Sequence, residues 1–138
     1  MQTIENQLNL TNSKKKSILI IEDEQDIADL LILVLTKEGY FVEKSLTAKE
    51  ANGILESALN LPDLILLDIK MPGLNGIDFC QKLKQSEKYC HIPIIMISAL
   101  VLPKDIELGY ACGAIDYIVK PWNNDDLLSR IKSRLLSR

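Results

Sequence analysis

A run of four apolar residues, Leu64 to Leu67, ends in a single carboxylate, Asp68, and turn-forming residues follow it. The run lacks helical periodicity and lies between Pro62 and Pro72, which is typical of a strand covered on both faces. Such strands belong to parallel sheets, where ligands bind beyond the carboxyl ends of the strands. Asp68 is therefore a candidate functional residue. The alternative is that it only caps the following turn, since aspartate favours turns and helix N-caps.

The rest of the chain alternates between strand and helix patterns. Strands are predicted at 17–21, 40–44, 64–67, 93–97 and 115–119. Helices are predicted from Gln25 to Gly39, over 47–59, from Asn75 or Gly76, after Pro103 and after Pro121. This alternation predicts an α/β fold, with one doubly wound parallel sheet and helices on both faces. The helix after Pro103 has a poor apolar stripe and contains Gly109, so we expect it to be the most mobile element.

Length and composition indicate one domain with few special features. The 138 residues suit a single domain, which we place at 18–138 after a flexible leader at 1–17. A net charge of only -3 gives no reason to expect direct nucleic-acid or membrane binding. No signal peptide or membrane span is visible, so a cytoplasmic location is predicted.

The three cysteines, Cys80, Cys90 and Cys112, lack CxxC spacing. Their odd number and spacing indicate reduced thiols of an intracellular protein and argue against a zinc site. We interpret them as packing residues.

Polar residues of the kind used in phosphoryl chemistry follow four of the five predicted strands. They are Glu22 with Asp23, Asp68, Ser98 and Lys120. Three neighbouring carboxylates repel one another unless a cation neutralises them, and oxygen ligands of this kind favour Mg²⁺. A lysine and a hydroxyl can bind phosphoryl oxygens, and an ionised aspartate can attack phosphorus. The set therefore predicts a magnesium-dependent phosphoryl-transfer site.

Four motifs carry a family resemblance: ILIIEDE at 18–24, LILLDIKMPGLNG at 64–76, IMISA at 95–99 and DYIVKPW at 116–122. Together they resemble the receiver domains of two-component response regulators. The resemblance covers residues 17 to about 136 and implies a CheY-like, flavodoxin-type strand order of 2-1-3-4-5 with five helices.

The resemblance also implies a role for each site residue. Asp68 would be the phosphoacceptor and Lys120 the phosphate partner. Ser98 and Tyr117 would be the switch residues. The Mg²⁺ ligands would be Asp23 directly, Glu22 mostly through water, Asp68 and the backbone carbonyl of Lys70.

The partners that the resemblance implies are a histidine kinase or a histidine phosphotransfer domain as the phosphoryl donor. Phosphorylation would alter the surface formed by the helix after Pro103, the strand at 115–119 and the last helix. An unknown downstream protein, or a second copy in a dimer formed through these two helices, would bind there.

Two residues depart from the simplest family pattern. Glu22 has one methylene more than the aspartate that is also common there. Lys70 places a cationic stem two residues after the phosphoacceptor, and we hypothesise that it changes the lifetime of the aspartyl phosphate. Tyr117 also fits ordinary sheet packing. Trp122 fits either the core or an exposed anchor for a partner.

Other function classes remain open at this stage. The chain could be a relay, or a receiver cut from a larger regulator. A small aspartyl-phosphate phosphatase normally needs a second acid two residues after its nucleophile, where this chain has Lys70. A binding module that keeps only the fold is a third class. We expect a signalling domain that phosphorylates and dephosphorylates itself and is not a turnover enzyme.

Overall fold

A computed structural model describes residues 15–70 and 75–136. The strands in this part of the chain are β1 (Ser17–Ile21), β2 (Phe41–Ser45), β3 (Leu64–Leu67), β4 (Ile94–Ser98) and β5 (Asp116–Val119). The helices are α2 (Gln25–Lys37), α3 (Ala48–Ser57), α4 (Gly76–Gln85), α5 (Pro103–Ala111) and α6 (Asn124–Leu136). Most of the predicted leader, residues 1–14, lies outside the described residues, so the division into leader and domain stays a prediction.

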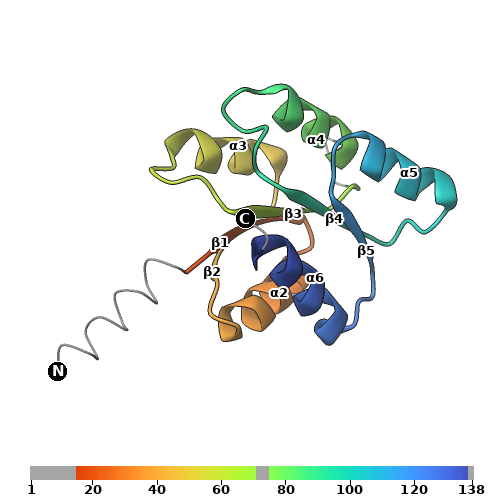
Figure 1. Ribbon diagram of the computed structural model, residues 1–138, viewed down its shortest axis with the longest axis horizontal. Helices are drawn as coiled ribbons and strands as arrows, with labels where there is room; N and C mark the ends of the chain where they lie inside the picture. The colour runs from red at the N-terminus through yellow and green to blue at the C-terminus, as the bar shows by residue number, and fades with distance from the viewer. Residues whose placement is uncertain (1–14, 71–74, 137–138) are drawn as a thin grey trace.

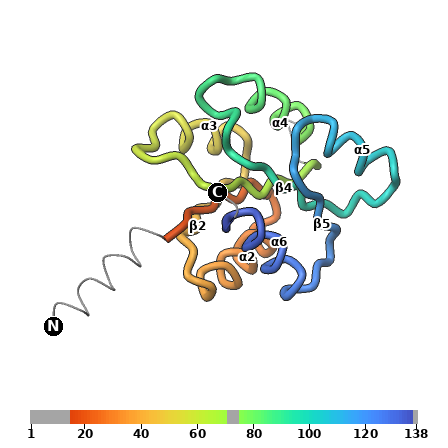
Figure 2. Tube along the Cα trace, in the orientation of Figure 1, coloured from red at the N-terminus to blue at the C-terminus, as the bar shows by residue number. Residues whose placement is uncertain are grey.

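The strands form one parallel sheet in the order β2-β1-β3-β4-β5, which confirms the predicted fold class and strand order. Helices α3, α4 and α5 lie in a row on one face (Figure 1). Helices α2 and α6 lie side by side on the other face, as Figure 2 also shows. The sheet is therefore the middle of three layers.

Alternate residues of each central strand enter two separate cores. On β1, Leu19 and Ile21 pack toward α3 and α4, whereas Ile18 and Ile20 pack toward α2 and α6. All four residues of β3 are fully buried, as expected for a strand with helices on both faces. Burial of both faces explains why the central strands appear in the sequence as continuous apolar runs.

Helix α2 has a narrower buried stripe than its apolar residues suggest. Its buried residues are Ala28, Leu31 and Leu35, whereas Leu30 is 46% exposed and Leu33 is 57% exposed. Leu30 shares the helical spacing of Ile27, Leu31, Val34 and Leu35, which predicts that it belongs to the apolar stripe facing the core, and its exposure shows that this prediction is wrong. Packing in the core therefore does not explain why Leu30 and Leu33 of α2 are apolar.

None of the described helices is both long and apolar enough to cross a membrane.

Helix α4 approaches the end of β3 so closely that only glycine fits at its first residue. A Cβ atom on Gly76 would lie 2.3 Å from the carbonyl oxygen of Asp68 and 2.7 Å from the Cα of Ile69. The Gly76 backbone N–H donates to the Ile69 carbonyl at 2.7 Å, and Asn75 caps the helix by accepting from Ile77 N–H. This contact fixes the backbone that carries the Asp68 carboxylate.

We expect Gly76→Ala to lower the free energy of unfolding by roughly 1–3 kcal/mol, because the methyl group meets backbone atoms that cannot rotate away. Urea denaturation measures the change. The matched control is Gly53→Ala in α3, where a Cβ meets nothing within 4 Å, and a helical alanine should add about 0.5–1 kcal/mol. Equal effects of the two substitutions would contradict the close contact.

Candidate functional site

The four predicted strand ends meet at one edge of the sheet. Ile21 of β1 lies level with Leu67 of β3, so the next residues, Glu22 and Asp68, are neighbours. Ser98 ends β4 and Lys120 follows β5. They surround a pocket of about 510 Å³ lined by Asp23, Glu24, Asp68, Lys70, Ser98, Ala99, Leu100 and Lys120.

Lys120 joins two carboxylates from two different strands. Its ammonium group lies 2.5 Å from Oε1 of Glu22 and 3.3 Å from Oδ2 of Asp68. Glu22 is fully buried and Asp68 is 4% exposed. Burying a carboxylate is costly unless it is paired and hydrogen-bonded. Lys120 pairs with both Glu22 and Asp68, and so offsets the cost of burying the two acids.

Backbone N–H groups fix the orientation of the polar side chains. The Glu24 N–H donates to Oε2 of Glu22 at 3.2 Å, and the Lys70 N–H donates to Oδ1 of Asp68 at 3.3 Å. The Leu100 N–H donates to the Ser98 hydroxyl oxygen at 3.1 Å. Both carboxylates are therefore held between a backbone donor and the Lys120 ammonium group.

Burial controls the protonation of this cluster. It raises the pKa of Glu22 from 4.5 to about 7, an effect that the negative charge of Asp68 increases and the hydrogen bond from Lys120 opposes. For Lys120 burial acts in the other direction and lowers the pKa, but the hydrogen bond to Glu22 and the charge of Asp68 outweigh it and leave the pKa raised. Lys120 therefore stays an ammonium ion at neutral pH.

The acids present fit a small divalent cation. Carboxylate oxygens of Glu22, Asp23 and Asp68 lie within 4.8 Å of one another. Two oxygens bound to one Mg²⁺ are at most about 4.2 Å apart, because each lies 2.0–2.1 Å from the ion. A small side-chain rotation would bring the carboxylate oxygens within this distance of one another. A water molecule between Glu22 and the ion would have the same effect. Asp23 is half-buried and lines the pocket, so it can reach an ion from solvent.

Tyr117 is the predicted switch aromatic, and its ring lies inside the molecule. It is 6% exposed, and its hydroxyl donates to the Leu100 carbonyl at 2.7 Å, next to Ser98. The ring fits because α5 has a glycine beside it: a Cβ on Gly109 would lie 2.8 Å from Cδ2 of Tyr117. Gly109, which weakens the helical pattern in the sequence, thus makes room for the tyrosine.

An apolar groove of about 740 Å³ adjoins the acidic pocket. Ile27, Leu30, Pro121 and Trp122 supply its apolar lining, and Glu24, Ala99 and Lys120 line both the groove and the pocket. Trp122 is half-buried and packs partly on the core, and its ring N–H donates to Asn124 at 2.9 Å. Trp122 therefore contacts the core on one side and lines the groove on the other. Its role as an anchor for a partner stays a prediction.

Every site residue that the sequence indicated comes to this edge of the sheet or lies directly beside it. Two features of this region are not evident from the sequence. The first is the contact of Lys120 with Glu22, which a strand pattern cannot predict because the two residues are 98 positions apart. The second is the groove, whose only signal was the surplus of leucines on α2. The roles of the individual residues stay predictions.

Comparison with known families identifies one match over most of the chain. The family model described as "Response regulator receiver domain" matches residues 18–132. The chain is 42% identical over 118 residues to the regulatory protein VanR of Enterococcus faecium, covering 86% of this chain and 49% of that protein. It is 38% identical over 118 residues to the phosphate regulon transcriptional regulatory protein PhoB of Rhizobium meliloti, covering 86% of this chain and 51% of that protein. The chain thus spans about half the length of these curated relatives.

Solved structures show the same fold. A CheY-like response regulator receiver domain protein from Methanospirillum hungatei superposes with a TM-score of 0.80 at 32% identity, covering 89% of this chain and 95% of that one. The chemotaxis response regulator CheY4 of Vibrio cholerae superposes with a TM-score of 0.79 at 28% identity, covering 87% of this chain and 98% of that one.

The raised pKa of Glu22 predicts a pH-dependent stability when divalent cations are absent. The folded state holds this proton more tightly than the unfolded chain, so the free energy of unfolding should fall as the pH rises from about 4.5 through about 7. The expected fall is of order 1–3 kcal/mol. Urea denaturation in EDTA at several pH values measures it.

Glu22→Gln is the control, because a glutamine cannot titrate. The variant should lose this part of the pH dependence, and Mg²⁺ at pH 7.5 should stabilise it less than the wild type. A slope that is unchanged in the variant would show that another group is responsible.

Proposed function

Because the chain belongs to the response regulator receiver domain family, we propose that it accepts a phosphoryl group on Asp68 from a phosphohistidine of a histidine kinase or a phosphotransfer domain. The observation that carries this proposal is the pairing of a buried carboxylate with a fixed cation: Asp68 is 4% exposed and lies 3.3 Å from the Lys120 ammonium group.

The proposed reaction is a direct displacement at phosphorus. A carboxylate oxygen of Asp68 forms the new bond, while the bond between phosphorus and the donor's imidazole nitrogen breaks and its electron pair returns to that nitrogen. No general base is needed, since a carboxylate oxygen attacks through a lone pair and has no proton to lose. Lys120 and the hydroxyl of Ser98 line the same pocket, where they can bind two of the phosphoryl oxygens.

Glu22, Asp23 and Asp68 are the side chains that would hold Mg²⁺, together with the Lys70 carbonyl that the family resemblance implies. Bound there, the ion would neutralise charge that builds up on the phosphoryl oxygens. The groove beside the pocket offers the donor an apolar surface that shares Lys120 with the site.

Phosphorylation would act on the output surface through Ser98 and Tyr117. A phosphoryl group on Asp68 can accept a hydrogen bond from the Ser98 hydroxyl, which now accepts from Leu100 N–H. The Leu100 carbonyl also holds the Tyr117 hydroxyl, so a shift of this loop would bias the position of the ring. We propose that a partner, or a second copy of the chain, binds on α5, β5 and α6. Exposed apolar residues on these elements are Leu108 and Tyr110 of α5, Val119 of β5 and Leu136 of α6.

The proposed role is that of a signalling domain which phosphorylates and dephosphorylates itself. A phosphatase with an aspartate nucleophile is the second candidate, since it uses the same residue types. Lys70 argues against it, because the position two residues after Asp68 carries a cation and not an acid.

Incubation with Mg²⁺ and acetyl phosphate should add about 80 Da to the intact protein, the mass of one phosphoryl group on a carboxylate. Asp68→Asn and EDTA should each abolish the adduct. The matched control is Asp63→Asn, which changes an acid at the other end of the same strand, where Asp63 accepts from Ser17 N–H. An adduct that survives Asp68→Asn would contradict the assignment, and rapid turnover of a phosphate ester would favour the phosphatase.

Lys70 should change how long the phosphoryl group persists. Its side chain is exposed and lines the pocket, and we propose that it shields the aspartyl phosphate from water. We expect Lys70→Ala to shorten the lifetime of the aspartyl phosphate about threefold, or ~0.7 kcal/mol in the barrier to hydrolysis. Decay of the adduct after removal of acetyl phosphate measures it. Lys82→Ala, on the exposed side of α4, is the control, and equal lifetimes in all three proteins would disprove the idea.

A further inference from the structure

Two cysteines that the proposed function does not use meet between α4 and the end of α5. Cys80 is fully buried and Cys112 is 4% exposed, although the residues are 32 positions apart. The Cys80 thiol donates to the Cys112 carbonyl at 3.4 Å, and the two side chains lie close enough for each to shift the pKa of the other. The Cys112 thiol donates to the Gly109 carbonyl at 3.0 Å.

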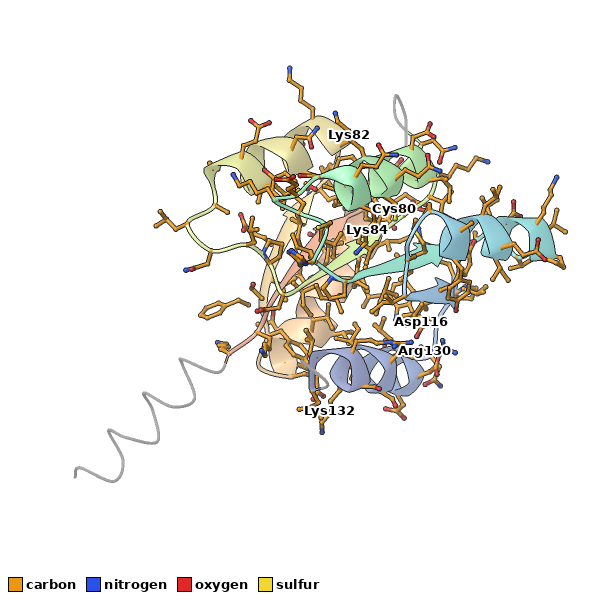
Figure 3. All side chains as sticks on the ribbon, turned by 45° about the horizontal axis from the view of Figure 1, so that its top comes forward. Cys80, Lys82, Lys84, Asp116, Arg130 and Lys132 are labelled. Atoms are coloured by element: carbon orange, nitrogen blue, oxygen red, sulfur yellow. The ribbon has the colours of Figure 1, made fainter. Side chains whose placement is uncertain are left out.

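A lysine from the same helix lies beside this pair. Figure 3 shows Cys80 and Lys84 on the side of α4 that faces the sheet, with Lys82 on the outer side. The Lys84 ammonium group donates to the carbonyls of Ile92 at 2.7 Å and Cys90 at 3.2 Å. Its charge favours the thiolate form of both Cys80 and Cys112.

Gly113 leaves room for the Lys84 stem to reach this position. A Cβ on Gly113 would lie 2.7 Å from Cγ of Lys84, and the backbone φ of Gly113 is +115°, which also favours glycine. Two backbone carbonyls therefore hold the Lys84 ammonium group, and the backbone of Gly113 lies against the Lys84 stem. A fixed cation beside a thiol is a typical feature of reactive cysteines.

The two thiols differ in how readily they ionise. The hydrogen bond from Cys80 lowers the pKa of Cys112 to about 7, against the opposing effect of burial. The same hydrogen bond and burial raise the pKa of Cys80. Both thiols are buried, and Cys112, at 4% exposed, needs the smaller opening of the structure for a small oxidant to reach it.

We propose that Cys80 and Cys112 form a redox-sensitive pair, which a small hydroperoxide converts into an intramolecular disulfide that joins α4 to the end of α5. The Cys112 thiolate attacks one oxygen of hydrogen peroxide and becomes a sulfenic acid, and the hydroxide that leaves takes up a proton to form water. The Cys80 thiol then attacks the sulfenic sulfur, the disulfide forms, and a second water leaves. Two thiols are oxidised and one peroxide is reduced.

The disulfide would restrain the element on which the output surface is built. On oxidation Cys112 loses the hydrogen that it donates to Gly109, and Gly109 lies against the ring of Tyr117. A covalent bond at the C-terminal end of α5 limits its movement relative to α4. The device does not depend on Asp68, so it can be tested apart from phosphorylation.

The first test uses a chain with Cys90→Ala, which removes the third thiol. Hydrogen peroxide should lower the mass of the non-reduced protein by about 2 Da, the two thiol hydrogens, and dithiothreitol should restore it. Adding Cys80→Ala or Cys112→Ala should abolish the loss. If the folded protein shows no mass loss while the guanidine-unfolded protein does, the thiols are inert packing residues and the proposal is wrong.

A second test addresses the role of the lysine. Lys84→Met keeps most of the apolar stem but removes the charge, so disulfide formation at pH 7 should slow severalfold. Lys82→Met, on the outer side of the same helix, should leave the rate unchanged. Equal rates in the two variants would remove Lys84 from the proposal.

A third test measures the consequence for α5. Hydrogen exchange of the amides at 104–111 should slow in the peroxide-treated protein and recover after reduction. Asp68→Asn should leave both changes intact, which separates this device from the proposed phosphorylation. Unchanged exchange in a protein that carries the disulfide would show that the bond forms without restraining the helix.

Discussion

The site depends on one electrostatic constraint, which is that two carboxylates taken out of water need a cation beside them. Glu22 and Asp68 come from adjacent strands and are buried at the same edge of the sheet. Lys120 supplies the cation from the far side of β4, where β5 ends. The strand order therefore matters for chemistry as well as for packing, because it brings the acids and the lysine together although they are far apart in the sequence. Removing the lysine alone would leave the two buried acids without the cation that both contact, and breaking a buried pair in this way is strongly destabilising.

Much of this arrangement follows from local patterns in the sequence. Burial on both faces removes periodicity from the central strands, so Leu64 to Leu67 are recognisable as a strand from their apolar character alone. The predicted β1 and β3 match the observed strands at both ends, and the other three differ by one residue. The edge at which Glu22, Asp68 and Ser98 meet follows from the parallel direction of the strands. These features depend on neighbours in the sequence or on a rule that holds for all parallel sheets.

The features that the sequence did not show depend on distances between elements. Leu30 belongs to an apolar pattern, but it is 46% exposed and lines the groove beside the site instead of the core. Gly109 looked like a defect in a weak helix, and only the position of the Tyr117 ring shows why a side chain is excluded there. The meeting of Cys80 with Cys112 likewise depends on how α4 packs beside the end of α5. Each case concerns the space between two elements, which residue patterns within one element do not encode.

The separation of the core into two halves by the sheet has a consequence for how such a chain can diverge. Adjacent residues of one strand, such as Leu66 and Leu67, belong to different halves and share few neighbours. Replacements on the α2 and α6 side can therefore accumulate and remodel the groove while the opposite half, which carries α5 and Tyr117, keeps its packing. The two faces of the sheet thus have separate cores that can change independently. The groove beside α2 and the packing around α5 and Tyr117 can therefore change at separate rates, although both belong to one small domain.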